Sequence, residues 1–452
     1  MNSRDTISAF ATPAHAAGMG VIRISGSEAR SVLSELVPAL ADSSSLEPRK
    51  LHYTAIIDPR QGESVDQGLV VWMPGPQTFT GEDVVEIHCH GGRRNMGRVL
   101  RATLSAGARI AEPGEFTRRA FLNGKMDLSQ AEAVLDVVDA RTEAGLDTAH
   151  AHLKGQLSEL VETFRAKIIT TLAHLEANID FVEEDVPQFA AEALMADMRS
   201  TREEILALIA TWNRGHLARA GIQLAIAGRP NAGKSSLFNA LLRDSRAIVT
   251  PIAGTTRDYL EEEADLAGLP VVLVDTAGLR VTEDPIESEG VARSHDRIAA
   301  ADLVIWLHDG TEAADADPER ERMPDALCVD VRSKSDLPAH PSWETSERSA
   351  LPISSETREG LDALIAHVSE RTGWTQQDGG STVILPRERH LNALNEASEA
   401  LERATNAAAE AMPWEIVSGE LQLALEAVGQ IAGHSTIEDV LDQIFREFCI
   451  GK

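Results

Sequence analysis

The sequence predicts a multidomain protein that combines α/β and all-α architecture. Its parts are an N-terminal α+β domain, a helical bundle that is discontinuous in the sequence, and an α/β domain inserted into that bundle. Short apolar runs between Gly and Pro turns predict the first part, and apolar residues spaced three and four apart predict the second. An apolar run that leads into a glycine-containing loop and a helix-like segment predicts the third. A chain of 452 residues is long enough for such domains.

The N-terminal domain is expected over residues 1–123. Its apolar runs, such as Val21 to Ile24 and Leu69 to Trp72, have the length of strands and lie between turns. His88-Cys89-His90 falls in this domain and consists of residue types that bind zinc. Alternate side chains of a strand point to opposite faces, so the three cannot share one ion, and packed histidines are the expected outcome.

Two stretches of helical periodicity flank the middle of the chain. The first is expected over residues 124–220 and repeats apolar residues at helical spacing from Leu153 to Leu175. The second is expected over residues 378–452 and repeats them from Leu421 to Ile431 and from Leu441 to Phe448. Together they predict one helical domain built from two separate segments.

The inserted domain is expected over residues 221–377. Gly228-Arg-Pro-Asn-Ala-Gly-Lys-Ser235 follows the apolar run Ile222 to Ala227 and opens a helix-like segment. Glycines let the backbone approach phosphate oxygens, Lys234 can reach the β and γ phosphates, and the Ser235 hydroxyl can hold Mg²⁺. A plain strand-to-helix turn would not need the complete pattern, so the loop predicts a phosphate site.

Four further motifs follow this loop in the order found in Ras-like GTPases: Gly254-Thr-Thr-Arg-Asp258, Asp275-Thr-Ala-Gly278, Ser333-Lys-Ser-Asp336 and Ser354-Ser355. Five motifs in register are far more specific than any one of them, and they predict a Ras-like P-loop G domain. The predicted GTP-binding residues are Asn231, Ala232, Gly233, Lys234, Ser235, Ser236, Thr250, Thr255, Thr256, Asp275, Thr276, Ala277, Gly278, Ser333, Lys334, Asp336, Ser354 and Ser355.

The residue types in these motifs suit a guanine nucleotide with its magnesium ion. Thr256 can coordinate Mg²⁺ together with Ser235, Asp275 can hold the ion through water, and the Gly278 amide can meet the γ phosphate. The Asp336 carboxylate can accept from two N–H donors on one edge of guanine, which adenine lacks. An ATPase is therefore disfavoured.

The chain departs from the usual GTPase pattern at two positions. Ser333 stands where guanine-nucleotide proteins usually have Asn, so one base contact and one tether to the phosphate loop are expected to be lost. Leu279 stands where Ras-like enzymes have the glutamine that orients water, and a leucine cannot do this. The residues alone leave four acids as replacements: Glu283, Asp284, Glu287 and Glu289.

Further segments are informative in combination. They are Gly20-Val-Ile-Arg-Ile-Ser-Gly26, Thr80-Gly-Glu-Asp-Val-Val-Glu86 with His90-Gly-Gly92, Pro113-Gly-Glu-Phe116, Arg119-Ala-Phe-Leu-Asn-Gly-Lys125 and the terminal Phe448-Cys-Ile-Gly-Lys452. With the GTPase motifs, they make the chain resemble the MnmE (TrmE) family of tRNA-modifying GTPases from end to end.

The resemblance implies a bacterial or organellar enzyme that works with a flavin-dependent partner, MnmG (GidA). Together they would add an aminomethyl or carboxymethylaminomethyl group to C5 of the wobble uridine of certain tRNAs. The one-carbon unit would come from 5-formyl- or methylene-tetrahydrofolate. The family also implies a homodimer, formed through the folate-binding N-terminal domain and contained in a heterotetramer with the partner.

The resemblance also implies which residues serve each site. The folate contacts would be Arg23, Glu86, Lys125 and Lys452, with Cys449 near the folate as a candidate catalytic thiol. The residues alone leave a frayed tail or a prenylation signal as alternatives for Cys449, although Gly451 and Lys452 disfavour the latter.

In the same family, K⁺ and the pairing of two G domains stimulate hydrolysis, and no external arginine is supplied. The matching potassium ligands are Asn231, Thr250, Ile252 and Thr255. A cation beside the β and γ phosphates would offset the charge that develops in the transition state. Glu287 matches the water-orienting glutamate by its place after Gly278, and it joins Lys234 as an expected catalytic residue.

Composition limits the remaining possibilities. Three scattered cysteines are too few for a disulfide framework, and no apolar run approaches the length of a membrane span, so a reducing cytoplasm and no membrane are expected.

The net charge of −29, from 42 basic and 71 acidic residues, repels nucleic acid at long range. Any tRNA contact must use a local basic surface or the partner. The N-terminal third is less acidic than the remainder because of a group of arginines, although scattered arginines are usually solvated surface. They are Arg93, Arg94, Arg98, Arg101, Arg109, Arg118 and Arg119.

One alternative function stays open at this stage. A regulatory GTPase could report its nucleotide state to a partner without any one-carbon chemistry. Such a switch would not need the N-terminal domain or the terminal Cys-Ile-Gly-Lys segment, which favours the enzyme. A G domain joined at both ends to a helical bundle can pass a change in its switch loops to distant helices, so nucleotide-driven reorientation is expected.

Overall fold

The computed structural model describes most of the chain. The described residues are 5–42, 45–140, 142–180, 191–244, 261–275, 301–315, 317–346, 349–374, 383–434, 438–446, 448 and 450–451. The chain divides into two compact units, one formed by residues 1–135, 152–165 and 425–452 and the other by residues 136–151 and 166–424. Within the described residues, no helix is both long and apolar enough to cross a membrane.

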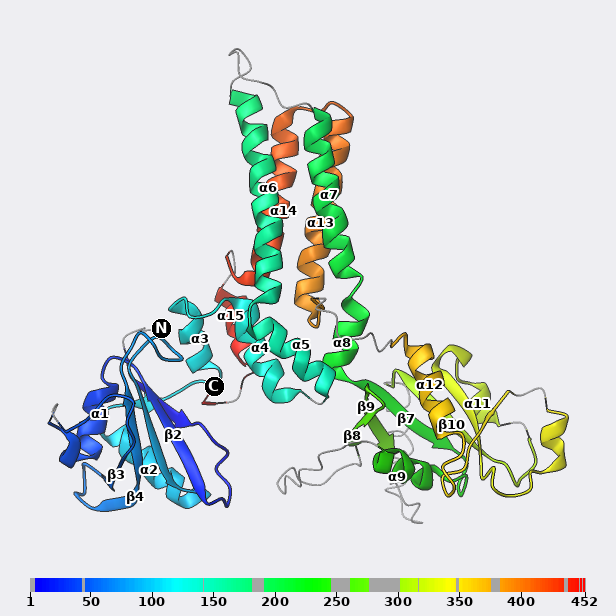
Figure 1. Cartoon of the computed structure of the whole chain (residues 1–452), viewed down its shortest axis with the longest axis horizontal. Helices are drawn as coiled ribbons and strands as arrows, with labels where there is room; N and C mark the ends of the chain where they lie inside the picture. Colours follow the sequence, from blue (N-terminus) through cyan, green and yellow to red (C-terminus); the bar gives the residue numbers. More distant parts are fainter. Residues whose placement is uncertain are drawn as a thin grey trace. The chain divides into compact units, whose positions relative to one another are not determined.

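The first unit contains a six-stranded sheet with the strand order β3-β4-β5-β2-β1-β6 (Figure 1). The strands are β1 (Ile7–Phe10), β2 (Met19–Ser25), β3 (His52–Ile57), β4 (Ser64–Met73), β5 (Val84–His90) and β6 (Arg109–Ile110). Neighbours are antiparallel except β1 and β6, which are parallel. The predicted strands at Val21 and Leu69 are confirmed as parts of β2 and β4.

Helices cover both faces of this sheet to different extents. Helices α1 (Ala29–Leu36) and α2 (Arg93–Ser105) pack on one face, where Ile22, Ile87 and Val99 belong to one buried core. On the other face, Phe116 of α3 (Glu115–Leu122) packs against β1. Glu86 and His88 of β5 also lie on this second face, beside the apolar Leu69 and Val71 of β4, and we call it the polar face because it carries these charged and imidazole groups.

The end of the chain packs on the same unit. Helix α15 (Glu438–Arg446) packs Phe445 against Leu128 at the start of α4 (Leu128–Asp139). Beyond it, Ile450 forms an antiparallel bridge with Pro113. Gly451 has a φ of 103°, and a Cβ at this position would clash with the Phe10 carbonyl oxygen. Only glycine allows so close an approach to β1.

The described part of the chain has four long helices: α6 (Gln156–Asp180), α7 (Ala191–Ile209), α13 (Glu388–Ala409) and α14 (Trp414–Ala432) (Figure 1). The second unit contains all of α7 and α13, together with residues 166–180 of α6 and 414–424 of α14. The predicted helical stripes are confirmed in α6, α14 and α15, with two differences at their ends. Leu153 is the last residue of α5 (Glu143–Leu153), before the turn at Gly155, and Phe448 lies beyond the end of α15.

Polar contacts join each neighbouring pair of these four helices around a closed ring, in the order α6–α7, α7–α13, α13–α14 and α14–α6. These contacts are Lys167–Glu204, Arg202–Glu402, Arg403–Glu420 and Ser418–Glu176.

The second sheet belongs to the same unit and has the order β12-β11-β10-β7-β9-β8. Its strands are β7 (Ile222–Gly228), β8 (Glu261–Leu266), β9 (Leu269–Asp275), β10 (Leu303–Asp309), β11 (Cys328–Ser333) and β12 (Leu351–Pro352). All neighbours are parallel except β8 and β9. Helices α9 (Lys234–Asp244) and α12 (Leu361–Thr372) pack on it through one apolar core. This is the α/β architecture predicted for the inserted segment.

The outgoing and return connections of this sheet meet at one point. Helix α8 (Trp212–Ala220) leads into β7, and residues 383–387 lead back to α13. Gly215 of α8 packs against the Leu385 backbone, and the Leu385 amide donates to the Thr211 hydroxyl at 3.1 Å. The two connections are therefore in direct contact.

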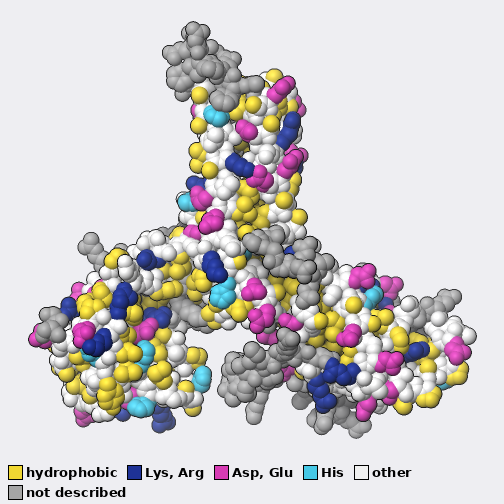
Figure 2. Space-filling model, viewed as in Figure 1, with side chains coloured by type: hydrophobic (Ala, Val, Ile, Leu, Met, Phe, Trp, Pro, Cys, Tyr) yellow, Lys and Arg dark blue, Asp and Glu magenta, His cyan; other side chains and the backbone are white. Residues whose placement is uncertain are grey.

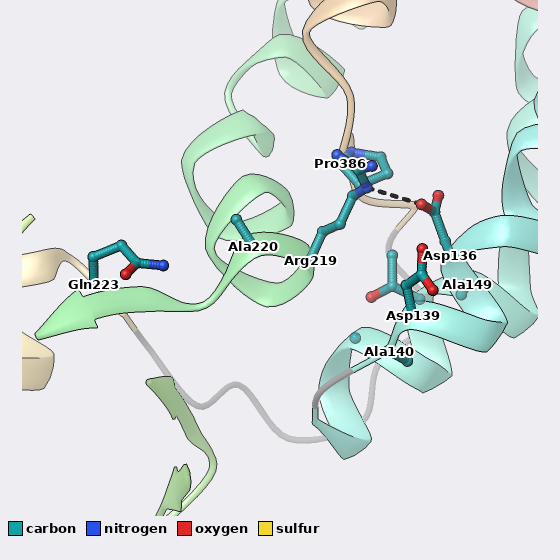
Figure 3. Close-up of a pocket in the computed structure, with 10 residues that line it drawn as sticks. Asp136, Asp139, Ala140, Ala149, Arg219, Ala220, Gln223 and Pro386 are labelled. Carbon is teal, nitrogen blue, oxygen red and sulfur yellow. Dashed lines mark hydrogen bonds and ion pairs between the residues drawn. The ribbon is translucent and has the colours of Figure 1, made fainter. Parts of the chain in front are cut away.

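A single carboxylate binds both connections. Asp136 on α4 accepts hydrogen bonds from Arg219 at 2.8 Å and from Arg387 at 2.7 Å. Its side chain is only 9% exposed. Figure 3 shows Arg219 extending from the end of α8 toward Asp136, beside a cavity of about 340 Å³ that Asp139, Ala149 and Pro386 also line. We call Asp136, Arg219 and Arg387 the junction cluster.

The close contact at Gly215 yields a stability prediction. In Gly215→Ala the new methyl group would clash with the Leu385 carbonyl oxygen, which cannot move without displacing the return connection. We expect a loss of about 1–3 kcal/mol, typical of overpacking, measured as a lower midpoint of thermal unfolding. Gly419→Ala is the matched control, because Gly419 lies in α14 with open space around it. There alanine should raise stability by about 0.5–1 kcal/mol, and equal midpoints for both variants would contradict the prediction.

Candidate functional site

The carboxyl ends of four neighbouring strands of the second sheet bring the predicted nucleotide motifs together. Parallel register places Asp275 of β9 beside Ile226, Gly228 of β7 beside Leu307, and Ser333 of β11 beside Asp309. The strand order reverses around β7, the strand that leads into the predicted phosphate loop. In open α/β sheets, ligands bind in the crevice at such a reversal point.

The loop after β7 has the backbone of a phosphate cradle. Gly228 and Gly233 have φ values of 136° and 96°, which favour glycine, and Asn231 is left-handed with a φ of 64°. A Cβ on Gly228 would clash with the Leu307 carbonyl, so the first glycine also permits close packing on β10. Helix α9 begins at Lys234, so its first amides lie at the loop, where they suit an anion.

The side chains of this loop are arranged for charge and metal binding. The Lys234 ammonium donates to the Gly228 and Arg229 carbonyls, both at 2.8 Å, which holds it over the loop. The side chains of Asn231, Ser235 and Ser236 are exposed. A lysine, exposed hydroxyls and the amides of a helix start in one place suit a polyphosphate and its magnesium ion.

Ser333 is hydrogen-bonded to the phosphate loop, although the sequence led us to expect that a serine in place of the usual Asn would lose this tether. Its hydroxyl lies 2.7 Å from the Ala232 carbonyl and 3.1 Å from the His308 carbonyl, and the residue is 2% exposed. A serine reaches the loop because the Ser333 backbone lies close to it, which sequence spacing does not reveal. The expected loss of a tether was therefore wrong.

Lys334 and Asp336, the other predicted nucleotide-binding residues of the Ser333–Asp336 motif, follow Ser333 in the sequence. Lys334 has a φ of 58° and its ammonium bonds the Asp309 carboxylate at 2.5 Å. Burial alone would raise the pKa of Asp309, but Lys334 and Thr311 outweigh it and hold that pKa below its usual value. Asp336 is exposed.

Ser354 and Ser355 are also predicted to bind the nucleotide, and the loop that carries them contacts the loop that carries Asp336. The Ser335 amide donates to the Ile353 carbonyl at 3.0 Å, which brings the Ser354 segment beside the Asp336 segment. The buried Ser354 hydroxyl accepts from the amides of Glu356 and Thr357. It thereby shapes its own turn, while Ser355 is half-buried.

Part of the predicted site lies outside the described residues. This applies to Thr250, Ile252, Thr255, Thr256, Thr276, Ala277, Gly278, Glu287, Cys449 and Lys452. Asp275 is described as the last residue of β9.

A second group of predicted residues meets on the polar face of the first sheet. Arg23 on β2 lies directly opposite Glu86 on β5, and its guanidinium donates to the Glu86 carboxylate at 2.8 and 3.0 Å. His88 lies 3.3 Å from the other carboxylate oxygen. Burial alone would raise the pKa of Glu86, but Arg23 and His88 outweigh it and hold that pKa below its usual value. Glu86 is therefore a carboxylate acceptor at neutral pH.

Lys125 lies beside the loop that borders this pair. Its ammonium donates to the Pro76 carbonyl at 3.0 Å, and its stem lies close to Gly81. Thr80 of the same loop bonds the Ser25 hydroxyl at 2.7 Å, on the strand that carries Arg23. The chain end also approaches this sheet through Gly451, which lies against Phe10.

Alternation along β5 separates the three metal-type residues, as predicted. Cys89 is buried in the core and lies 3.6 Å from the Gly20 carbonyl, and burial raises its pKa to about 11. His88 lies on the opposite face with Glu86. His90 bonds Asp66 at 2.8 Å, but its side chain is 73% exposed, so the expectation of packed histidines was wrong for His90. The Cys89 thiol is thus a neutral core group.

A buried ion network was not predicted from the sequence. Arg119 binds Glu82 at 3.2 Å, Glu115 at 2.9 Å and Asp5 at 2.7 Å. Glu82 also accepts from the Ser25 hydroxyl at 2.7 Å. Apart from Asp5, these residues lie in the segments that carry the family resemblance, and the sequence held no other signal for the network. Their role is to fix α3 and the 76–82 loop against β2.

Comparison with known proteins gives matches over nearly the whole chain. The MnmE helical domain model matches residues 128–449, and the model of the GTP-binding protein TrmE N-terminus matches residues 6–125. The tRNA modification GTPase MnmE of Syntrophus aciditrophicus is 41% identical over 99% of this chain and 100% of that protein. Those of Heliobacterium modesticaldum and Geobacter sulfurreducens are 42% and 40% identical over 99% and 100% of each chain.

Similarity to solved structures is more limited. Aquifex aeolicus Era bound to GDP and AlF4⁻ is 24% identical and covers 39% of this chain and 66% of that chain, with a TM-score of 0.27. That score is too low to support a structural argument. The full-length identities and the two family models agree, and by them the chain belongs to the MnmE family of tRNA modification GTPases.

Proposed function

We propose that this protein hydrolyses GTP and couples hydrolysis to modification of C5 of the wobble uridine in certain tRNAs. A flavin-dependent partner of the MnmG type shares the reaction, and a tetrahydrofolate supplies the one-carbon unit. The observation that carries the proposal is the meeting of the phosphate loop, Asp275 and Ser333 at one edge of the second sheet. Membership of a tRNA modification GTPase family supports the substrate.

The described loop residues fit GTP with Mg²⁺. The α9 amides and Lys234 would hold the phosphates, Ser235 with Thr256 would hold the ion, and Asp336 would bind guanine. Bound Mg²⁺ supplies charge neutralisation at the phosphates. Glu287 would orient water for attack on the γ phosphorus, with cleavage of the bond to the GDP oxygen.

Potassium is proposed as a second ion of this site. Asn231 fits as a ligand because it is exposed at the loop with a left-handed backbone. Thr250, Ile252 and Thr255 are proposed as the others. K⁺ bound here would offset transition-state charge in the absence of an arginine.

The polar face of the first sheet is proposed as the folate site. Glu86 would accept from the N–H edge of the pterin, and Arg23, Lys125 and Lys452 would attract the glutamate tail. The chain end reaches the same sheet, which supports a role for Cys449 at this site. Folate bound there supplies the one-carbon unit.

The domain assignment follows from these roles. We assign residues 1–123 to folate binding and dimerisation, 221–377 to the G domain, and 124–220 with 378–452 to the helical domain. The protein acts as a cytoplasmic homodimer within a heterotetramer. Nucleotide-driven reorientation of the G domain would be transmitted where its two connections meet.

One functional prediction concerns the potassium ion and the proposed catalytic residue Glu287. GTP turnover should be faster in KCl than in NaCl, because K⁺ offsets charge in the transition state. Glu287→Ala should lose about 10²-fold or more in kcat while still binding GTP, a loss typical of a missing general base or water-orienting group.

Steady-state phosphate release in the two salts measures both effects, with Glu283→Ala as the matched control from the same acidic segment. Equal rates in both salts would remove the cation mechanism. A Glu287→Ala enzyme as fast as the control would remove the glutamate from catalysis.

The second prediction concerns base recognition. The Ser333 hydroxyl has one proton, and two backbone carbonyls already compete for it. It therefore cannot also donate to guanine N7, whereas the two protons of an Asn amide could serve both. We expect GTP and 7-deaza-GTP to bind with equal affinity.

Competition against a fluorescent GDP analogue measures this ratio. Ser333→Asn should restore a preference for GTP of about fivefold, the value of one neutral hydrogen bond. A tenfold preference for GTP in the native chain would contradict the prediction.

The third prediction concerns the Arg23–Glu86 pair. Glu86→Gln should weaken 5-formyltetrahydrofolate binding by about 10–100-fold, because a charge-assisted hydrogen bond contributes about 1.5–3 kcal/mol. Glu35→Gln is the matched control, since Glu35 is exposed on α1, which covers the other face. Isothermal calorimetry measures affinity, and circular dichroism checks folding. Folate binding unchanged in Glu86→Gln would exclude this face as the site.

A further inference from the structure

The structure divides the seven arginines singled out in the sequence between Arg93 and Arg119 into two groups. Arg109, Arg118 and Arg119 each form ion pairs within 3.2 Å of a carboxylate. Their charge is therefore already compensated inside the first unit. The other four belong to α2, and among the described residues they have no hydrogen-bond or ion-pair partner through their side chains.

The α2 arginines form a continuous surface. Arg94, Arg98 and Arg101 are spaced four and three residues apart, so they share one face of the helix. All three are exposed, and the opposite face is buried through Met96 and Val99. Arg93 is exposed at the start of the same helix. We call Arg94, Arg98 and Arg101 the α2 arginine stripe.

The surroundings of the stripe do not neutralise it. Helix α2 contains no acidic residue. Among the described residues, the carboxylate hydrogen-bonded to a side chain of the helix is that of Asp66, which accepts from Asn95 at 2.6 Å and is also bound by the His90 amide and ring. Like charges four residues apart on a helix destabilise it by about 0.2–0.5 kcal/mol per pair.

An uncompensated basic stripe is unexpected in so acidic a chain. The chain has 71 acidic residues against 42 basic ones, so an acid near any surface arginine would be the usual arrangement. A stripe that lowers helix stability and has no partner within its own unit points to an anionic partner from outside.

We propose that the α2 arginine stripe binds the phosphate backbone of tRNA. This inference rests on the proposed function and adds the surface by which an acidic chain meets its nucleic acid. Guanidinium groups form paired hydrogen bonds with phosphate oxygens. From Arg94 to Arg101 the helix rises about 10 Å, which spans roughly three phosphates of one strand.

The chemistry of the stripe predicts the kind of recognition. Helix α2 has no aromatic residue to stack on bases, and arginine–phosphate contacts carry no sequence information. The stripe therefore orients tRNA, while selection of the wobble base belongs to other parts of the complex. Binding through it should be strongly dependent on salt.

The test measures tRNA affinity of the full-length protein by fluorescence anisotropy across a KCl series, with and without the flavin-dependent partner. In the triple variant Arg94→Gln, Arg98→Gln, Arg101→Gln, affinity at low salt should fall at least tenfold. The slope of log K against log salt should become shallower by about 2–3, as expected for three lost phosphate contacts.

The matched control removes the same net charge elsewhere. Arg60→Gln, Arg199→Gln, Arg322→Gln changes three other exposed arginines and should leave affinity and slope close to those of the native chain. Equal weakening by both triple variants would overturn the proposal, because only net charge would then matter. So would a stripe variant that binds tRNA normally but loses the protein partner, since the stripe would then be a protein interface.

Failure of this inference can be distinguished from failure of the proposed function. GTP turnover and 5-formyltetrahydrofolate binding report on the proposed function and involve no stripe residue, so both should be normal in the stripe variant. A native chain that is active in both assays but binds no tRNA, alone or with the partner, would overturn the stripe and leave the nucleotide and folate sites standing.

Discussion

The carboxylate of Asp136 is the interaction on which the second unit depends. An inserted domain must leave and rejoin the same helical scaffold, and here both connections converge on one acid through Arg219 and Arg387. With Asp136 only 9% exposed, loss of one partner would leave a poorly solvated charge, which typically costs about 3–5 kcal/mol. The junction cluster therefore makes α8 and the return segment move together.

The first unit has a comparable constraint in the ion network around Arg119. Three carboxylates from different segments meet this one guanidinium, and Glu82 links it to Ser25 on β2. The network thereby fixes the strand that carries Arg23 and the loop that borders Lys125. Arg23 and Glu86 can pair on the polar face because the Arg119 network, formed by residues distant in sequence, fixes the strand and the loop at the edge of that face.

The sequence predicted what depends on local order and left out what depends on distant contacts. The periodicity in α6 and α14 and the loop before α9 follow from neighbouring residues, so these elements were predictable. The Ser333 tether was not, because it depends on how closely β11 approaches the loop at Ala232. Likewise, seven arginines look alike in sequence, and only tertiary contacts divide them into compensated and uncompensated groups.

The geometry of β7 limits how a change at the phosphate loop can be passed to α8 and the return segment. Its carboxyl end leads into the phosphate loop and its amino end follows α8, about 23 Å away for a strand of this length. The strand is buried between β10 and β9, and close-packed interiors shift as rigid bodies more readily than they stretch. A nucleotide-dependent change at the phosphate loop is therefore expected to move β7 together with its neighbouring strands. The proposed reorientation would then act where α8 and the return segment are joined to Asp136.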